Sequence, residues 1–281
     1  MEYRPLGRTG EKIAAIGLGT WRIGGGMSPD YSHDEEAVEA IRYAIELGIT
    51  HIDTAEIYGG GHSEELVGEA IKAFPREEVF ISTKVWSNHL RYDEVLKACE
   101  RSLKRLQTNY IDLYMIHWPS SSTPLSETMK AFEKLYKDGK IRYIGVSNFT
   151  AEELEEARSH LSTTDVMANQ VEYSLYHRSI EKTLMPYCFK TGVTIIAYSP
   201  LGKGAIAREA SSRSRHGELL RKIAEKYSKT PVQVALNWVI WHDQVIAIPK
   251  SIQKKHLEEN ARAAGWKLSE EDYRKISEAW R

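Results

Sequence analysis

Short apolar runs alternate with amphipathic stretches along almost the whole chain. Runs such as IDLYMI, VTIIAY and VIAI are continuous rather than alternating, which is typical of parallel strands covered on both faces. An opening hairpin is predicted over Glu2–Pro5 and Lys12–Ile13. After it we predict eight strands: Ala15–Gly19, His51–Asp53, Val79–Lys84, Ile111–His117, Tyr143–Ser147, Val166–Gln170, Thr194–Tyr198 and Val245–Pro249.

The segments between these strands carry helix-start signals. Ser32 with Glu35, and Thr150 with Glu153, have the spacing of a capping box. Thr123-Pro124 and Thr230-Pro231 each place a proline at the predicted first helical position. Two helices are expected beyond the eight strand–helix units, near Val232–Trp241 and Glu270–Ala279.

Eight strand–helix units limit the fold to few choices. Parallel strands joined by right-handed crossovers favour a (β/α)8 TIM barrel, with an N-terminal β-hairpin and two extra helices. The chain has 281 residues, which suits one such barrel of about 250 residues. No Ser/Pro-rich linker divides it, so residues 1–281 are predicted to form one domain. An open doubly wound sheet is the alternative.

Composition narrows the partners. The chain is 42% hydrophobic with a formal net charge of -1, so no overall field attracts nucleic acid or an anionic membrane. Its two cysteines, Cys99 and Cys188, form no metal or disulfide pattern and are expected to be buried. The start MEYRPLGRTGEK lacks an apolar signal region. We therefore expect a cytoplasmic monomer that acts on a small molecule.

Polar residues stand at nearly every predicted strand end. In a (β/α)8 barrel the active site lies at the carboxyl ends of the strands. A polar residue at one strand end could merely cap the next helix, but the whole set indicates a site. Its members are Asp53 with Tyr58, Lys84, His117, Ser147 with Asn148, Asn169 with Gln170, Tyr198 with Ser199, and Lys250 with Ser251.

Four of these residues suit the reduction of a carbonyl group. A nearby ammonium such as Lys84 favours the phenolate of Tyr58 and lowers its pKa, and Asp53 would keep the lysine charged. The phenol can then protonate an alkoxide while the imidazole of His117 hydrogen-bonds the same oxygen. Because the set supplies no hydride, a nicotinamide cofactor is required.

Several ordered strings resemble the aldo-keto reductases. They are GLGTW (17–21), HIDTAEIYGGG (51–61), STKVW (82–86), DLYMIHWP (112–119), GVSNF (145–149) and IPKS (248–251). The resemblance implies a (β/α)8 barrel and reversible, NAD(P)H-dependent reduction of aldehydes and ketones to alcohols. It also implies Tyr58 as the general acid, Lys84 and Asp53 as the pair that tunes it, and His117 as the residue that orients the carbonyl.

The same resemblance implies how a nucleotide is held. Ser147, Asn148 and Gln170 would bind the nicotinamide carboxamide, and Tyr198 would stack on the ring. The loop of Ser199, Pro200, Leu201, Gly202, Lys203 and Gly204 would follow the pyrophosphate. The small, polar segment 209–217 is expected to be a mobile lid or a disordered surface loop. The remaining implied contacts are Gly19, Thr20, Trp21, Asp53 and Pro249.

One position departs from the family pattern at the adenosine end. Lys250 and Ser251 match the family's site for the 2′-phosphate of NADPH, and Glu259 and Asn260 match its adenine positions. The arginine that usually clamps the phosphate corresponds to His256. A neutral imidazole lacks the charged bidentate fork of arginine. We therefore expect NADP(H), NAD(H) or both, with dual or NAD-leaning use as the hypothesis.

The substrate side resembles that of short-loop prokaryotic and archaeal, alcohol dehydrogenase-like members. Trp21, Trp86 and Trp118 would form an aromatic pocket with Tyr58 and His117, or would simply pack between barrel and helices. Only a short turn follows His117, and the chain stops soon after the last predicted helix. An open pocket for small alcohols, ketones and dicarbonyls is expected.

The sequence also carries weaker signals for other functions. Tyr136 and Lys140 have the YxxxK spacing of short-chain dehydrogenases but no Gly-rich nucleotide loop precedes them. The histidines and cysteines show no metal-ligand spacing, so no metal is expected. A barrel hydrolase could pair Asp53 with Glu172. A non-catalytic nicotinamide-nucleotide sensor on the same barrel would retain the four polar residues.

Overall fold

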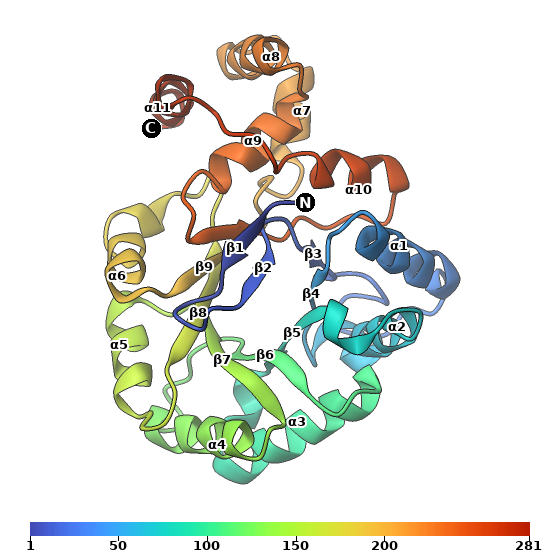
Figure 1. Ribbon diagram of the computed structural model, residues 1–281, viewed down its shortest axis with the longest axis vertical. Coiled ribbons are helices and arrows are strands. Elements are labelled where there is room, and N and C mark those ends of the chain that lie inside the picture. The colour runs from blue at the N-terminus through green and yellow to red at the C-terminus, as the bar shows by residue number, and fades with distance from the viewer.

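Eight parallel strands form the centre of the protein, for which a computed structural model describes all residues 1–281 (Figure 1). Each strand hydrogen-bonds to the next one along the chain. The strands are β3 (Leu18–Gly19), β4 (His51–Asp53), β5 (Phe80–Val85), β6 (Ile111–Ile116), β7 (Ile141–Ser147), β8 (Val166–Glu172), β9 (Thr194–Tyr198) and β10 (Val245–Ala247).

The sheet closes on itself between its first and last strands. The backbone N–H of Ala247 donates to the carbonyl of Ala15 at 3.0 Å, and the N–H of Gly17 donates to that of Ala247 at 2.8 Å. A parallel bridge joins Ile16 to the same residue. The predicted (β/α)8 barrel is therefore confirmed, and the open doubly wound sheet is wrong.

Alternate residues of each strand point into the barrel, since the side-chain period of a strand is two. Inside, Phe80, Leu113, Met115, Ile196 and Ile246 share one apolar cluster. The intervening residues face the helices and join a core of 65 buried residues. This alternation explains why both faces of the strands are apolar in sequence, and it aims the last inward residue of each strand at the carboxyl-end mouth.

The predicted hairpin, β1 (Tyr3–Pro5) and β2 (Lys12–Ala14), covers the other end of the barrel (Figure 1). Leu6 and Ile13 are buried and belong to the same apolar cluster as the barrel interior. The amino-terminal end is thus plugged, so a ligand can approach the interior only from the carboxyl ends of the strands.

A ring of helices surrounds the barrel (Figure 1). Its members are α1 (Asp34–Glu46), α2 (His62–Ile71), α3 (Tyr92–Leu106), α4 (Leu125–Lys137), α5 (Ala151–Ser159), α6 (Leu184–Thr191), α9 (Pro231–Val239) and α10 (Lys254–Ala261). Short 3-10 turns are η1 (Tyr58–Gly61), η2 (Arg76–Glu78), η3 (Ser87–His89) and η4 (Ser179–Glu181). None of the helices is long and apolar enough to cross a membrane.

The helices outside the ring differ from the expectation. The helix predicted near Val232–Trp241 is α9, which contacts α10 and β10 and so takes a place in the ring. The outer helices are α7 (Ala205–Ser211), α8 (Arg215–Tyr227) and α11 (Glu270–Ala279), which lie together at one side of Figure 1. The β9–β10 connection therefore holds three helices, one more than predicted.

The helix caps follow the predicted chemistry in part. Thr150 and Glu153 form the capping box of α5, and Thr230 caps α9 with a proline in its first turn. Pro124 is the N-cap of α4 rather than its first helical residue. The box at Ser32 is wrong: α1 begins at Asp34, and the Ser32 hydroxyl binds Asp30 instead. Both cysteines are buried and unpaired, as expected.

Candidate active site

Four polar residues from three neighbouring segments converge at the carboxyl end of the barrel. Asp53 is the last residue of β4, Lys84 is the inward residue near the end of β5, and His117 directly follows β6. Tyr58 opens the turn η1 that follows β4. The inward period of the strands brings Asp53, Lys84 and His117 to the mouth, and the turn after β4 adds Tyr58.

Asp53 and Lys84 form a buried ion pair. The Lys84 Nζ donates to Asp53 Oδ1 at 2.8 Å and to the carbonyl of Thr54 at 2.7 Å. The side chain of Lys84 is 0% exposed and that of Asp53 is 2% exposed. The other carboxylate oxygen, Oδ2, accepts from Gln170 Nε2 at 2.7 Å and Ser82 Oγ at 2.9 Å. Three donors thus stabilise the charge of this buried carboxylate, one at Oδ1 and two at Oδ2.

Tyr58 sits above this pair, between two further rings. Lys84 Nζ lies 5.1 Å from the centre of the Tyr58 ring. The His117 ring is 5.6 Å away from it, and the Trp21 ring 4.9 Å away, both in edge-to-face arrangements. The phenol is thus fixed beside an ammonium and an imidazole at the open end of the barrel.

Burial decides the charge state of the phenol. It raises the pKa of Tyr58 above its ordinary value, while the ammonium of Lys84 works to lower it. The sequence correctly indicated the direction of the lysine's effect, but the expected net lowering is wrong. Burial also works to lower the pKa of Lys84, yet the charges of Asp53 and Tyr58 outweigh it and leave that pKa raised. Tyr58 therefore carries its proton, and Lys84 its charge, at neutral pH.

His117 is a neutral imidazole. Burial, assisted by the charge of Lys84, lowers the pKa of His117 to about 3. Its Nδ1 is buried without a hydrogen-bond partner. The backbone carbonyl of His117 accepts from Asn148 Nδ2 at 3.0 Å, which anchors the end of β6 to the end of β7. The arrangement can donate a proton from one group and a neutral hydrogen bond from another to a single oxygen atom.

Two of the three predicted pocket tryptophans adjoin these residues. Trp21 packs edge-on against Tyr58, and Trp86 packs edge-on against His117 at 5.2 Å. Trp118 is 43% exposed and makes no such ring contact. Trp86 is held by Glu56, which accepts its backbone N–H at 2.6 Å. An apolar rim therefore borders the polar group on two sides.

The residues predicted for the nicotinamide end form one hydrogen-bonded group. Tyr198 donates to Asn148 Oδ1 at 3.0 Å, and Asn148 Nδ2 donates to Ser147 Oγ at 3.0 Å. Ser147 in turn donates to the carbonyl of Gln170 at 2.9 Å. Asn148 has a φ of 64°, which an asparagine tolerates better than most residues. Since Gln170 also holds Asp53, this group is joined directly to the ion pair.

The loop predicted to follow a pyrophosphate lies beyond β9. Ser199, Gly202, Lys203 and Gly204 all have positive φ, so the backbone folds tightly. Lys203 is 72% exposed and lies 3.3 Å from Glu172. Pro200 is buried and Leu201 half-buried.

The segment 209–217 is mostly helical rather than a disordered loop. It joins the end of α7 to the start of α8, with Ser214 as the cap of the second helix. The carboxylate of Glu209 accepts from the Ser214 hydroxyl within the segment and from the Tyr176 hydroxyl, and the second contact ties the segment to the body. Small polar residues here serve as caps rather than as flexible linkers.

The residues predicted for the adenosine end surround the start of α10. Lys250 and His256 are exposed and make no side-chain hydrogen bond or ion pair within the chain. Ser251 is buried and accepts the backbone N–H of Gln253 at 3.0 Å. Of the adenine positions, Glu259 accepts from Thr230 and Asn260 is buried. The other residues implied to contact the cofactor are Pro249, which is buried, Gly19, whose N–H donates to the Pro249 carbonyl, and Thr20, whose hydroxyl accepts from Ser63.

Two residues connected to the ion pair were not predicted from the sequence, one in direct contact with it and one in contact through the other. Ser82 donates to Asp53, and His51 lies 2.8 Å from the Ser82 hydroxyl. The available signal was the strand period, because each lies two residues before a predicted site residue on the same strand. The proposed pairing of Asp53 with Glu172 as hydrolytic carboxylates finds no support, since all of Asp53's oxygens are engaged and Glu172 faces Lys203.

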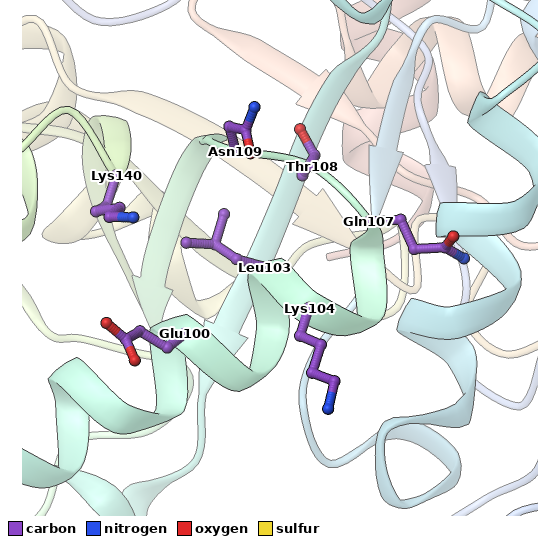
Figure 2. Close-up of a pocket in the computed structure, with 7 residues that line it drawn as sticks. All are labelled: Glu100, Leu103, Lys104, Gln107, Thr108, Asn109 and Lys140. Carbon is purple, nitrogen blue, oxygen red and sulfur yellow. The ribbon is translucent and has the colours of Figure 1, made fainter.

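A shallow polar hollow of about 420 Å³ lies elsewhere. Figure 2 shows its lining on the end of α3 and the residues before β6, with Lys140 before β7. These residues precede their strands, so the hollow is at the amino-terminal end of the barrel, away from Tyr58. It is not part of the candidate active site.

Comparison with known proteins identifies the family of the chain. A model of the aldo/keto reductase family matches residues 15–281. A thermostable aldo-keto reductase, crystallised with the inhibitor epalrestat, is 48% identical over 99% of both chains, with a TM-score of 0.93. An aldo/keto reductase from Klebsiella pneumoniae in complex with NADP and acetate is 36% identical over 100% of this chain and 96% of its own (TM-score 0.87). Glyoxal reductase of Bacillus subtilis (strain 168) is 42% identical over 95% of this chain and 89% of its own. The chain therefore belongs to the aldo/keto reductase family.

Proposed function

We propose that the protein reversibly reduces small aldehydes, ketones and dicarbonyls to alcohols, with a nicotinamide nucleotide as the source of reducing equivalents. The observation that carries the proposal is the protonated Tyr58 beside the buried Asp53–Lys84 pair and the neutral His117. The relatives support it, since one acts on glyoxal and another was crystallised with NADP. In the opposite direction the same site would act as an alcohol dehydrogenase.

Tyr58 is proposed as the general acid. Its raised pKa keeps the proton in place at neutral pH, and an alkoxide is a much stronger base than the phenolate. Proton transfer to the product oxygen is therefore downhill. Lys84 would stabilise the phenolate that remains, and Asp53 would keep that ammonium charged and in place.

His117 is proposed to orient the carbonyl. A neutral imidazole can donate one hydrogen bond to the oxygen without competing with Tyr58 as a proton source. An imidazolium at this position would repel Lys84 and weaken the ion pair. Trp21 and Trp86 would exclude water from the sides of the reacting oxygen, which strengthens both interactions.

The residues of the barrel mouth fit a dinucleotide. Ser147, Asn148 and Gln170 present amide and hydroxyl groups suited to a carboxamide, and the half-buried ring of Tyr198 offers a stacking face. When bound, the nucleotide would supply the hydride equivalent that no side chain here can provide. The tight turn from Ser199 to Gly204 permits close backbone approach to phosphates.

The charge at the adenosine end suits a nucleotide with or without a 2′-phosphate. Lys250 is exposed and has no internal partner, so it is free to bind an anion. His256, which is also exposed and unpaired, supplies one hydrogen bond where an arginine would supply a charged fork. We propose that the protein uses both NADPH and NADH.

Turnover of glyoxal and a panel of simple aldehydes, diones and secondary alcohols, followed by nicotinamide absorbance, tests the proposal. Replacing Tyr58 with Phe should lower kcat by about 10²- to 10⁴-fold and leave nucleotide affinity nearly unchanged. Tyr143→Phe is the matched control, because that hydroxyl binds Glu11 at the other end of the barrel. A protein that binds NADPH but turns over no carbonyl would be a nucleotide sensor instead.

A further inference from the structure

A pair of polar side chains lies beneath Asp53, inside the barrel, and the proposed mechanism does not use it. His51 and Ser82 are both 0% exposed. His51 lies two residues before Asp53 on β4, and Ser82 lies two residues before Lys84 on β5. Both therefore point into the barrel, one layer below the ion pair.

The hydrogen bonds of this pair have a defined direction. Ser82 Oγ lies 2.9 Å from Asp53 Oδ2, and a carboxylate can only accept, so the single hydroxyl hydrogen of Ser82 goes to Asp53. Ser82 must then accept from His51 Nε2, at 2.8 Å. This leaves His51 in the neutral Nε2–H form, with a bare lone pair on Nδ1. The structure agrees, since His51 Nδ1 has no partner.

The imidazole of His51 fits inside the barrel only because residue 17 has no side chain. A Cβ on Gly17 would lie 2.8 Å from His51 Nδ1 and 2.9 Å from the His51 carbonyl, so only glycine allows the ring to sit there. The ring of Phe80 packs edge-on against it at 5.4 Å. Burial, opposed by the charge of Asp53, lowers the pKa of His51 to about 4. An uncharged ring is thus held rigidly against Ser82.

A purely structural role does not require polar residues at this depth. Leu113 pairs with Ser82 across the ladder and fills the neighbouring strand's position with an apolar side chain. A buried hydroxyl and imidazole must be hydrogen-bonded to offset their loss of water, a requirement that an apolar side chain does not have. Here the chain of donors ends on the carboxylate that holds Lys84.

We infer that His51 and Ser82 are positioning residues for the proton donor, acting through a one-way hydrogen-bond chain from His51 to Ser82 to Asp53. The inference rests on the proposed function of Tyr58. An ammonium has three hydrogens, and Lys84 spends two on Asp53 Oδ1 and the Thr54 carbonyl. The third is left for the Tyr58 hydroxyl. Fixing the second oxygen of Asp53 fixes the carboxylate plane, and with it the direction of that third hydrogen.

The test compares Ser82→Ala and His51→Leu with variants that restore the chemistry. Ser82→Ala should lower kcat about ten-fold or more, a loss similar to that seen when a residue that hydrogen-bonds to a metal ligand is replaced. KM and the dissociation constant of NADPH should stay within about two-fold of the wild-type values. His51→Leu should have a smaller effect, and His51→Gln, which keeps a donor, should restore part of the loss. Thr83→Val is the matched control: it removes a buried hydroxyl from Glu64 on the outer face of the same strand.

The second measurement does not depend on turnover. Tyrosine labelled with ¹³C at Cζ reports the ionisation of Tyr58 by NMR, and Tyr58→Phe identifies its signal. A misdirected Lys84 stabilises the phenolate less, so the pKa of Tyr58 should rise in Ser82→Ala and stay unchanged in Thr83→Val. The same shift should appear in the pH profile of alcohol oxidation, where Tyr58 must be deprotonated.

The outcomes separate the two proposals. An unchanged Tyr58 titration in Ser82→Ala, or losses of kcat in Ser82→Ala and Thr83→Val that simply follow their losses in Tm, would overturn the positioning role. If the Tyr58 pKa rises in Ser82→Ala but the wild-type protein reduces no carbonyl, the proposed function is rejected and the hydrogen-bond chain stands.

Discussion

Removing the ammonium of Lys84 should destabilise the protein as well as inactivate it. In Lys84→Met, Asp53 Oδ1 loses its only side-chain donor in an interior where the two side chains are 0% and 2% exposed. Breaking a buried pair from one side typically costs about 3–5 kcal/mol, because an uncompensated charge remains. The entropy of unfolding is about 2.1 cal/mol/K per residue, so for 281 residues each kcal/mol lowers Tm by about 1.7 °C. The expected fall in Tm is about 5–8 °C.

The reciprocal and double variants complete the cycle. Asp53→Asn leaves the ammonium buried without its counter-charge and should cost a similar amount. The double variant Asp53→Asn/Lys84→Met removes both charges, and Ser82 and Gln170 can still donate to the asparagine carbonyl oxygen. It should be more stable than the sum of the single losses predicts, by at least about 2 kcal/mol. All three variants should lose turnover.

Urea unfolding at pH 7, with calorimetry to check Tm, measures the cycle, and carbonyl turnover is measured on the same samples. Circular dichroism at low temperature verifies that each variant is folded before its stability and turnover are compared. A loss below about 1 kcal/mol in either single variant, or a loss in the double variant equal to the sum of the two, would contradict a coupled buried pair. Either result would mean that the pair is solvated and that its charges do not depend on each other.

Three further predictions concern pH, cofactor and stability. Burial lowers the pKa of His51 to about 4 and that of His117 to about 3, so below pH 6.5 the unfolded chain binds protons that the folded protein does not bind. The free energy of unfolding should therefore fall as the pH drops from 6.5 toward 4, by up to about 2.7 kcal/mol per pH unit from these two groups. Urea titrations at pH 7, 6 and 5 check this, and His51→Gln should remove about half of the slope; an identical slope would contradict the assignment. His256→Arg should tighten NADPH binding about ten-fold or more without changing NADH binding, because it adds a charged fork for the 2′-phosphate; fluorescence titration with both nucleotides measures it, and an equal gain for both would place His256 elsewhere. Thr150→Ala should cost about 1 kcal/mol in urea with no change in kcat, since it removes the capping box with Glu153; a loss of activity larger than the loss of folded protein would argue against a purely local role.

The strand ends show what can be predicted without coordinates. Asp53, Lys84 and His117 were found because continuous apolar runs end in polar residues, and parallel strands in a barrel deliver such ends to one face. The same rule fails for residues inside the barrel. His51 and Ser82 do not stand at the carboxyl end of a strand, so the strand-end rule does not select them. Only the pairing of β4 with β5 brings them together.

Local signals were reliable where they were self-contained. The box of Thr150 with Glu153 forms as its spacing predicts, because both partners are within one turn. Segment 209–217 looks like a flexible loop by composition, yet it is helix and cap. There Glu209 is held by Tyr176, which lies 33 residues away, and no local propensity reports such a contact.

The sequence by itself determined the barrel, the order of its strands and the identity of the groups at its mouth, because these depend on periodicity and on which residue follows each strand. Only the tertiary structure decided the charge states and the partners of those groups. The pKa of Tyr58 is raised rather than lowered because the depth of burial outweighs the neighbouring ammonium. Depth of burial is a property of the closed barrel as a whole, and the hydrogen bonds from β5 and β8 to Asp53 exist only once residues 29 to 117 positions apart meet.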